Sequence, residues 1–250
     1  MAEDHGHSPL HQFEIAKVID IKIGGADVSF TNSSVVMTIA VIAIIAFLTL
    51  GVRRRALVPG RWQSLAELSY EFVGNMIRDN VGKEGLKYFP LIFTLFMFVL
   101  FGNLLGLVPY SFTYTSHIAV TAALALMVIT VVTGVGLALH GLHFFSFFVP
   151  KGVPAVMLPL MVPIEIISYL SRPVSLAIRL FANMMAGHTM MKVFAGFVIT
   201  LGAATFGVGA IAPLAMNVAL TGFELLVAFL QAYVFTVLTC LYLNDAIHLH

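Results

Sequence analysis

Long apolar stretches alternate with short polar segments along the 250-residue chain. The first apolar stretch, residues 33–52, is uninterrupted and long enough to span the hydrocarbon core of a bilayer as a helix. Two further stretches of similar length follow at 89–109 and 117–140, and no Asp, Glu, Lys or Arg occurs between Phe89 and Pro150. The pattern therefore predicts three transmembrane helices in this part of the chain.

Residues 61–82 follow a different pattern. Apolar side chains recur there at helical spacing, with Gln, Glu and Arg between them: Trp62, Leu65, Leu68, Phe72, Met76 and Ile77. This spacing is typical of an amphipathic helix. Beside a bilayer we expect such a helix to lie in the interface plane, and a soluble linker helix is the alternative.

The C-terminal region contains two long apolar segments, 153–195 and 205–243, with a Gly/Ala-rich break inside 196–213. About 40 helical residues extend about 60 Å, which is about twice the hydrocarbon thickness. We therefore expect broken or strongly tilted helices, with Pro173 and Pro213 at bends or starts. The two segments are interpreted as a tilted helical hairpin that completes an all-α membrane fold.

Composition supports a membrane protein. Hydrophobic residues make up 60% of the chain and charged residues 10%, whereas soluble domains have about 45–50% and about 25%. One cysteine, Cys240, excludes a disulfide framework, and nothing favours nucleic-acid binding or a soluble catalytic domain. The chain has no Gly-x-x-x-x-Gly-Lys-Ser/Thr phosphate loop, so we expect no bound nucleotide. We expect no cofactor and no metal.

Charge at the two ends of the first span predicts its orientation. Residues 1–32 carry Asp and Glu where a signal peptide has a positive region, and they are interpreted as an external segment. Arg53, Arg54 and Arg55 follow the span directly. The positive-inside rule then places the N-terminus outside and the arginine cluster in the cytoplasm.

A few ionisable residues interrupt the apolar C-terminal segments: Glu165, Arg172, Arg179, His188, Lys192 and Glu224. Near mid-bilayer, inserting a charged side chain costs ~2.5–3.5 kcal/mol on translocon scales, so each needs a reason. Glu165, Arg172 and Arg179 are seven residues apart and lie on one helix face. The same stripe includes Ser168, Ser175 and Asn183.

The second segment carries a similar stripe. Its members, spaced four, three and seven residues apart, are Asn217, Thr221, Glu224 and Gln231. Facing polar stripes on two antiparallel helices form either a hydrated path or mutually neutralising pairs. Glu224 and His188 are natural partners, because a carboxylate beside an imidazole relays a proton near neutral pH.

Charge pairing inside the chain is the plainest interpretation of these groups, with Glu165 on Arg172 and Glu224 on His188. The guanidinium of Arg179 is always charged, and two interpretations stay open for it. Either a carboxylate from another subunit faces it, or the side chain snorkels to the lipid interface.

Three segments, in this order, resemble subunit a of F-type ATP synthases. They are NLLGLVP at 103–109, SRPVSLAIRLFANMMAGH at 171–188 and LQAYVFTVL at 230–238. The resemblance covers about residues 30–245 in architecture and is most specific around Arg179 and Gln231. Three motifs in the expected order make it a strong match.

The resemblance implies a non-catalytic stator subunit that conducts protons against a rotating ring of c subunits. The proton gradient would thereby drive ATP synthesis elsewhere in the complex. Arg179 aligns with the family's essential arginine, which faces the carboxylate of each passing c subunit. Its fixed charge would favour the ionised carboxylate and block leakage between two offset half-channels. Further partners implied are b-type stator subunits and membrane lipid, in a cell inner membrane with a cytoplasmic C-terminus.

The resemblance also distributes the polar residues between the half-channels. The outer one would be lined by Asn183, His188, Glu224 and Gln231. The inner one would be lined by Glu165, Ser168, Arg172 and Ser175. Some family members exchange the two residue types found here at His188 and Glu224, and the exchange favours contact between these positions.

Two other functions are less consistent with the sequence. A secondary transporter would have an internal repeat and broken helices in both halves, and the N-terminal spans lack charges. A haem-binding electron carrier needs axial histidines on opposite sides of one plane. His140 and His143 do not meet that requirement.

Overall fold

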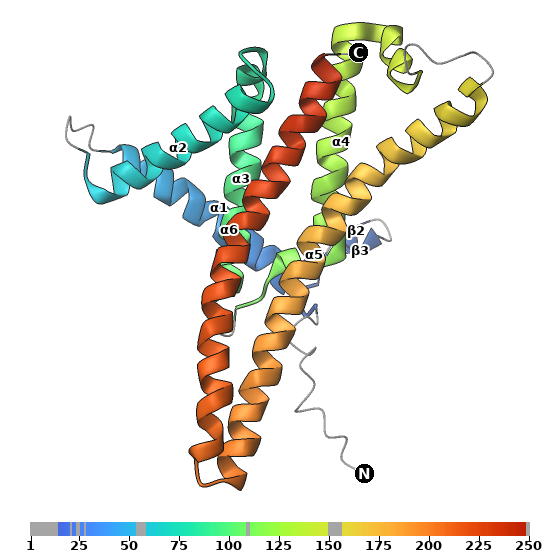
Figure 1. Ribbon diagram of the computed structural model, residues 1–250. Helices are drawn as coiled ribbons and strands as arrows, with labels where there is room; N and C mark the ends of the chain where they lie inside the picture. Colours follow the sequence, from blue (N-terminus) through green and yellow to red (C-terminus); the bar gives the residue numbers. More distant parts are fainter. Residues whose placement is uncertain are drawn as a thin grey trace. The chain divides into compact units, whose positions relative to one another are not determined.

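The computed structural model describes residues 15–20, 22–23, 26–27, 29–53, 59–108, 111–149 and 157–248. Six α-helices dominate this part of the chain (Figure 1): α1 (Asn32–Val52), α2 (Arg61–Asn80), α3 (Phe89–Gly106), α4 (Ile118–His140), α5 (Leu158–Ala204) and α6 (Ile211–Ile247). Short 3-10 helices lie between them: η2 (Glu84–Tyr88), η3 (Tyr114–Ser116), η4 (Gly141–Phe148) and η6 (Val208–Ala210).

Two short antiparallel ribbons precede α1. Strand β1 (Lys17–Ile19) pairs with β4 (Phe30–Thr31), and β2 (Lys22–Ile23) pairs with β3 (Ala26–Asp27). These strands were not predicted from the sequence, because each has only two or three residues. Residues 1–14, 21, 24–25 and 28 of the predicted N-terminal segment lie outside the described residues, as do Arg54 and Arg55.

The predicted all-α membrane fold is confirmed. In the described ranges, five helices are long and apolar enough to cross a membrane. Helices α1, α3 and α4 match the three predicted spans to within a few residues, and α2 matches the amphipathic segment. Position 109 and residues 153–156, at the ends of two predicted helices, lie outside the described part.

Helix α5 is longer than the predicted segment 153–195, and α6 is slightly shorter than the predicted segment 205–243. Helix α5 has 47 residues and contains Pro163 and Pro173, and α6 has 37 residues. At 1.5 Å per residue α5 extends about 70 Å. The helix continues through both prolines, so α5 is not broken at Pro173.

The chain divides into two compact units. Unit 1 comprises Met1–Ala46, Phe98–His117 and Phe181–Gln231, and unit 2 comprises Phe47–Met97, Ile118–Leu180 and Ala232–His250. Helices α1, α3, α5 and α6 each contribute a segment to both units.

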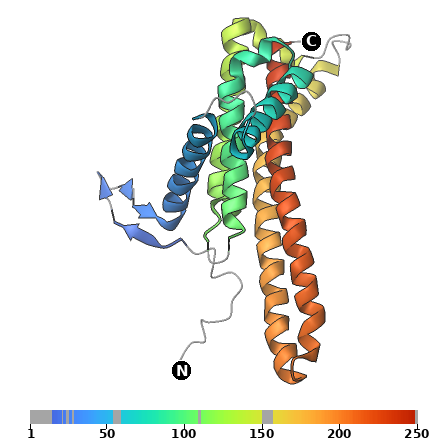
Figure 2. The same ribbon diagram turned by 90° about the vertical axis from the view of Figure 1, so that its left-hand side faces the viewer.

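In unit 1, the second part of α5 and the first part of α6 run antiparallel, side by side (Figures 1 and 2). Their connection begins at Thr205, inside the predicted Gly/Ala-rich break. Phe206 and Gly207 adopt left-handed backbone conformations there, with φ of 51° and 93°. The Thr205 hydroxyl oxygen accepts a 2.7 Å hydrogen bond from the Gly209 amide, and the Gly207 amide donates to Gly202 O at 2.8 Å.

In unit 2, α2 packs through aromatic side chains. The ring of Phe72 lies 5.7 Å from that of Phe96 in α3 and 5.8 Å from that of Tyr233 in α6. The predicted apolar face of α2 is therefore divided between two surroundings. Phe72, Met76 and Ile77 face neighbouring helices, whereas three residues are exposed: Trp62, Leu65 and Leu68.

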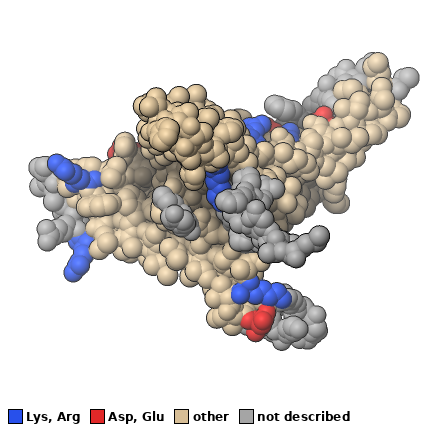
Figure 3. All heavy atoms as spheres, turned by 90° about the horizontal axis from the view of Figure 1, so that it is seen from below, with Lys and Arg blue, Asp and Glu red and all other residues tan. Residues whose placement is uncertain are grey.

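The surface of the described chain is largely uncharged. On the face in Figure 3, Lys, Arg, Asp and Glu form isolated patches among other residues. Many exposed side chains of α5 and α6 are large and apolar, as expected for helices whose solvent is lipid.

Candidate functional site

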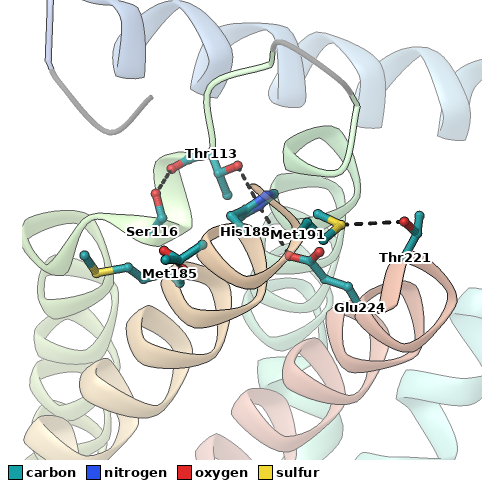
Figure 4. Close-up of polar contacts among 8 residues, drawn as sticks. Thr113, Ser116, Met185, His188, Met191, Thr221 and Glu224 are labelled. Atoms are coloured by element: carbon teal, nitrogen blue, oxygen red, sulfur yellow. Dashed lines mark hydrogen bonds and ion pairs between the residues drawn. The ribbon is translucent and has the colours of Figure 1, made fainter. Parts of the chain in front are cut away.

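The centre of unit 1 is a buried pair of ionisable side chains from α5 and α6 (Figure 4). His188 Nε2 lies 3.7 Å from Glu224 Oε1, with the two side chains 8% and 4% exposed. The contact that the sequence predicted between these residues is confirmed. No described residue donates a hydrogen bond to either carboxylate oxygen of Glu224. The His188 imidazole is the ionisable group that the structure places against this carboxylate.

Gly187 creates the space that Glu224 occupies. A Cβ at position 187 would lie 2.7 Å from Glu224 Oε1 and 3.0 Å from its Cδ. A side chain there would therefore displace the carboxylate. Glycine beside His188 allows the two helices to approach closely at the pair.

The loop before α4 completes this cluster, and sequence reasoning missed it. Residues 113–116 of this loop are buried, although they lie in the short link between two predicted spans, 89–109 and 117–140. Thr113 Oγ1 lies 3.0 Å from His188 Nε2, and Ser116 Oγ donates to Thr113 O at 2.6 Å. The available signal was four consecutive hydroxyl residues between two apolar spans: Thr113, Tyr114, Thr115 and Ser116.

The last residue of this loop, His117, packs its imidazole against an aromatic side chain. His117 stacks on Phe112, with ring centroids 4.8 Å apart. Burial lowers the pKa of His117 from its ordinary value, so its imidazole is neutral at pH 7.

Two amide side chains are buried in unit 1. Asn103 in α3 donates a 3.1 Å hydrogen bond to Ala228 O in α6, so it connects these two helices. Gln231 lies two helical turns beyond Glu224 on the same stripe and is 4% exposed. Thr221, on the same stripe, is exposed and donates to Met191 Sδ at 3.6 Å.

In unit 2, Arg172 pairs with a residue that the sequence did not indicate. Its Nη1 donates to Asp245 Oδ2 at 2.8 Å. Three aromatic rings surround the guanidinium at 5.1–5.6 Å: Phe147, Tyr169 and Tyr242. Carboxylate and rings together stabilise the charge.

The expected pairing of Glu165 with Arg172 is wrong, because Arg172 is directed to Asp245. Residues seven apart are two turns apart on a helix, and helical side-chain pairs form at three or four. Asp245 was missed since it lies just beyond the predicted apolar segment, where a charge needs no special explanation.

The remaining members of the α5 stripe lie at its accessible surface. Ser168, Ser175 and Arg179 in unit 2 are exposed, and Glu165 is half-buried. Exposed apolar side chains also occur on the neighbouring turns of α5, among them Val174 and Ile178 at 56% and 48%. Asn183, in unit 1, is also exposed. Within the described ranges, no three His, Cys, Asp or Glu side chains gather as metal ligands.

Long apolar helices that bury an ionisable pair and present an arginine among apolar residues define an ion-conducting, multi-pass membrane protein. The family described as ATP synthase A chain matches residues 34–244. The chain belongs to this family.

Similar proteins cover almost the whole chain, and each is described as ATP synthase subunit a. The protein of Rhizobium leguminosarum bv. trifolii (strain WSM2304) is 60% identical over 244 residues, which are 97% of this chain and 98% of the relative. That of Chelativorans sp. (strain BNC1) is 62% identical over 242 residues, 96% and 97% of the two chains. That of Rhodospirillum rubrum is 59% identical over 244 residues, 98% and 100%.

Membership of this family confirms the resemblance that the three sequence motifs indicated. The chain is a non-catalytic, multi-pass subunit of the ATP synthase of the bacterial inner membrane, and it couples proton translocation to ATP synthesis. The transporter and haem-protein alternatives are thereby excluded.

Proposed function

We propose that Arg179 faces the carboxylate of each c subunit as the ring turns. The observation that carries this proposal is the exposure of Arg179 on α5 among exposed apolar side chains. A guanidinium keeps its charge at every accessible pH. At this surface it is placed to act on a group of another subunit.

The fixed charge of Arg179 explains how a c subunit releases its proton and why protons do not pass directly from one half-channel to the other. A cation close to a carboxylate favours its ionised form, so a protonated c subunit gives up its proton near Arg179. The same charge repels protons and prevents direct flow between the half-channels. Each charge that crosses 100 mV yields about 2.3 kcal/mol, so several protons are needed for each ATP.

The outer half-channel is proposed to be lined by Asn183, His188, Glu224 and Gln231. Burial of the His188–Glu224 pair supports this assignment, as does the absence of described hydrogen-bond donors to the carboxylate. A carboxylate and an imidazolium in contact pass a proton between them with no change in the net charge of the pair.

We expect Gly187→Ala to lower ATP-driven proton pumping about three- to tenfold by displacing the Glu224 carboxylate. Alanine forms helix better than glycine by about 1 kcal/mol, so a weaker helix does not explain such a loss. Pumping by inverted membrane vesicles measures it. Gly222→Ala in α6 is the matched control, because a Cβ there meets no atom within 4 Å; equal pumping by both variants would contradict the expectation.

The inner half-channel is proposed to be lined by Glu165, Ser168, Arg172 and Ser175. Exposure of both serines and partial exposure of Glu165 support this assignment. The ion pair with Asp245 and the surrounding rings fix the Arg172 guanidinium. Arg172 is therefore a stationary charge beside the path.

The proposed orientation has the N-terminus outside and the C-terminus in the cytoplasm. Arg53 and Arg61, which flank the link from α1 to α2, support it through the positive-inside rule. The c-subunit ring and b-type stator subunits are the proposed partners within the complex.

Disulfide cross-linking tests the proposed contact with the ring. Ser175→Cys and Leu176→Cys are each made with Cys240→Ala, together with a cysteine beside the c-subunit carboxylate. Ser175 is exposed and Leu176 is 2% exposed, so we expect oxidation to link only the first variant to a c subunit. Equal linking of both variants, or of neither, contradicts the proposed face.

A further inference from the structure

The buried loop at 113–116 rests on two glycines at the end of α3. A Cβ at Gly102 would meet the Tyr114 side chain, and a Cβ at Gly106 would meet the Thr113 side chain. The two glycines are one helical turn apart, so they present bare backbone on the same face. The loop therefore folds back onto α3 more closely than any side chain would allow.

Tyr114 fixes the loop in this position. Its hydroxyl donates a 2.7 Å hydrogen bond to Phe98 O, and its ring lies 5.1 Å from that of Phe98. Burial raises the pKa of Tyr114 from its ordinary value, so the phenol keeps the proton that it donates. The hydrogen bond from Ser116 to Thr113 O closes the loop from its other side.

This anchoring brings the Thr113 hydroxyl to the nitrogen that faces Glu224 (Figure 4). His188 Nε2 lies 3.0 Å from Thr113 Oγ1 and 3.7 Å from Glu224 Oε1. A ring nitrogen carries either one proton or one lone pair, so it makes one strong hydrogen bond at a time. Thr113 and Glu224 therefore compete for Nε2.

We propose that Thr113 is a positioning residue for proton transfer between His188 and Glu224. While His188 is an imidazolium, protonated on both ring nitrogens, Nε2–H donates a hydrogen bond to the Thr113 oxygen, which holds the ring. When the Nε2 proton passes to the Glu224 carboxylate, the ring becomes a neutral imidazole with its proton on Nδ1, and the Thr113 hydroxyl turns to donate to the lone pair on Nε2. Thr113 itself gains and loses no proton. The inference rests on the proposed function of the pair in the outer half-channel.

Two substitutions of Thr113 in the assembled complex, one that removes the hydroxyl and one that keeps it, test this role. Thr113→Val has nearly the same shape but no hydroxyl, and Thr113→Ser keeps the hydroxyl. We expect Thr113→Val to lower ATP-driven proton pumping about three- to tenfold per assembled complex, and Thr113→Ser to stay within about twofold of the parent. Equal loss in both variants would show that Thr113 acts by packing and would overturn the inference.

Gly106→Ala tests the same role without removing the hydroxyl, and it serves if Thr113→Val does not assemble. The new Cβ displaces the Thr113 side chain, so we expect a similar loss of pumping. Gly134→Ala in α4, where a Cβ meets no atom within 4 Å, is the matched control. Pumping by Gly106→Ala equal to that of Gly134→Ala overturns the inference.

Arg179→Ala, measured in parallel, separates this inference from the proposed function. If Arg179→Ala stops pumping while Thr113→Val pumps normally, Thr113 has no positioning role but the proposed function stands. If Arg179→Ala pumps normally, the proposed function fails, and the inference about Thr113 fails with it.

Discussion

Arg179→Ala is expected to lower ATP-driven proton pumping about a hundredfold or more, because a charge placed opposite another charge in lipid contributes several kcal/mol. Passive proton flow through the same membranes should persist or rise, because no fixed charge then separates the half-channels. Arg179→Lys should be intermediate, since an ammonium keeps the charge but lacks the planar fork of a guanidinium.

ATP-driven proton pumping is measured in inverted membrane vesicles by the fluorescence quenching of a pH-sensitive dye. The signal is divided by the amount of assembled chain. Ile178→Ala is the matched control, because Ile178 is adjacent, 48% exposed and uncharged. Normal pumping by assembled Arg179→Ala complexes would contradict the role of Arg179 as the separating charge.

Exchanging His188 and Glu224 is expected to preserve more function than either single change. His188→Glu places two carboxylates side by side, and Glu224→His places two imidazoles there, because the parent side chains are in contact at 3.7 Å. Leaving one partner of a buried pair without its complement costs about 3–5 kcal/mol, which corresponds to at least a hundredfold. The double exchange restores a complementary pair and should pump within about tenfold of the parent.

Pumping rates of the two single variants, the double variant and the parent form a double-mutant cycle. A positive coupling shows that the residues act as a pair in translocation. If the double variant is no better than the single variants, the contact is structural and has no part in the proton path. Thr113 faces the same nitrogen, so incomplete recovery of the double variant is expected.

The membrane helices could be predicted because length and hydrophobicity alone determine them. Residues 33–52 and 117–140 have almost the same bounds as α1 and α4. The full length of α5 was harder to predict. Proline is expected to break a helix, yet Pro163 and Pro173 lie within it.

The contact between His188 and Glu224 could be predicted because each residue lies in an apolar segment where a charge needs a partner. The same reasoning did not identify the partner of Arg172. Its partner, Asp245, lies 73 residues away at the end of another helix, and sequence spacing cannot reveal such a pair.

Thr113 was missed for a related reason. A hydroxyl residue in a short loop is ordinary on a surface, and burial of this one depends on Gly102 and Gly106. Glycines in an apolar span give no indication of which side chain will lie against them. Only the path of the loop in three dimensions connects Gly106, Thr113 and His188.

The connection between α5 and α6 has a consequence for biogenesis. On the proposed orientation, this tip must cross the bilayer while the chain inserts. Residues 205–210 contain no Asp, Glu, Lys or Arg, and the Thr205 side chain and helix carbonyls already bind its amides. Polar backbone groups that are bonded internally enter lipid more easily. Both long helices are therefore suited to leave the translocon together, as one preformed hairpin.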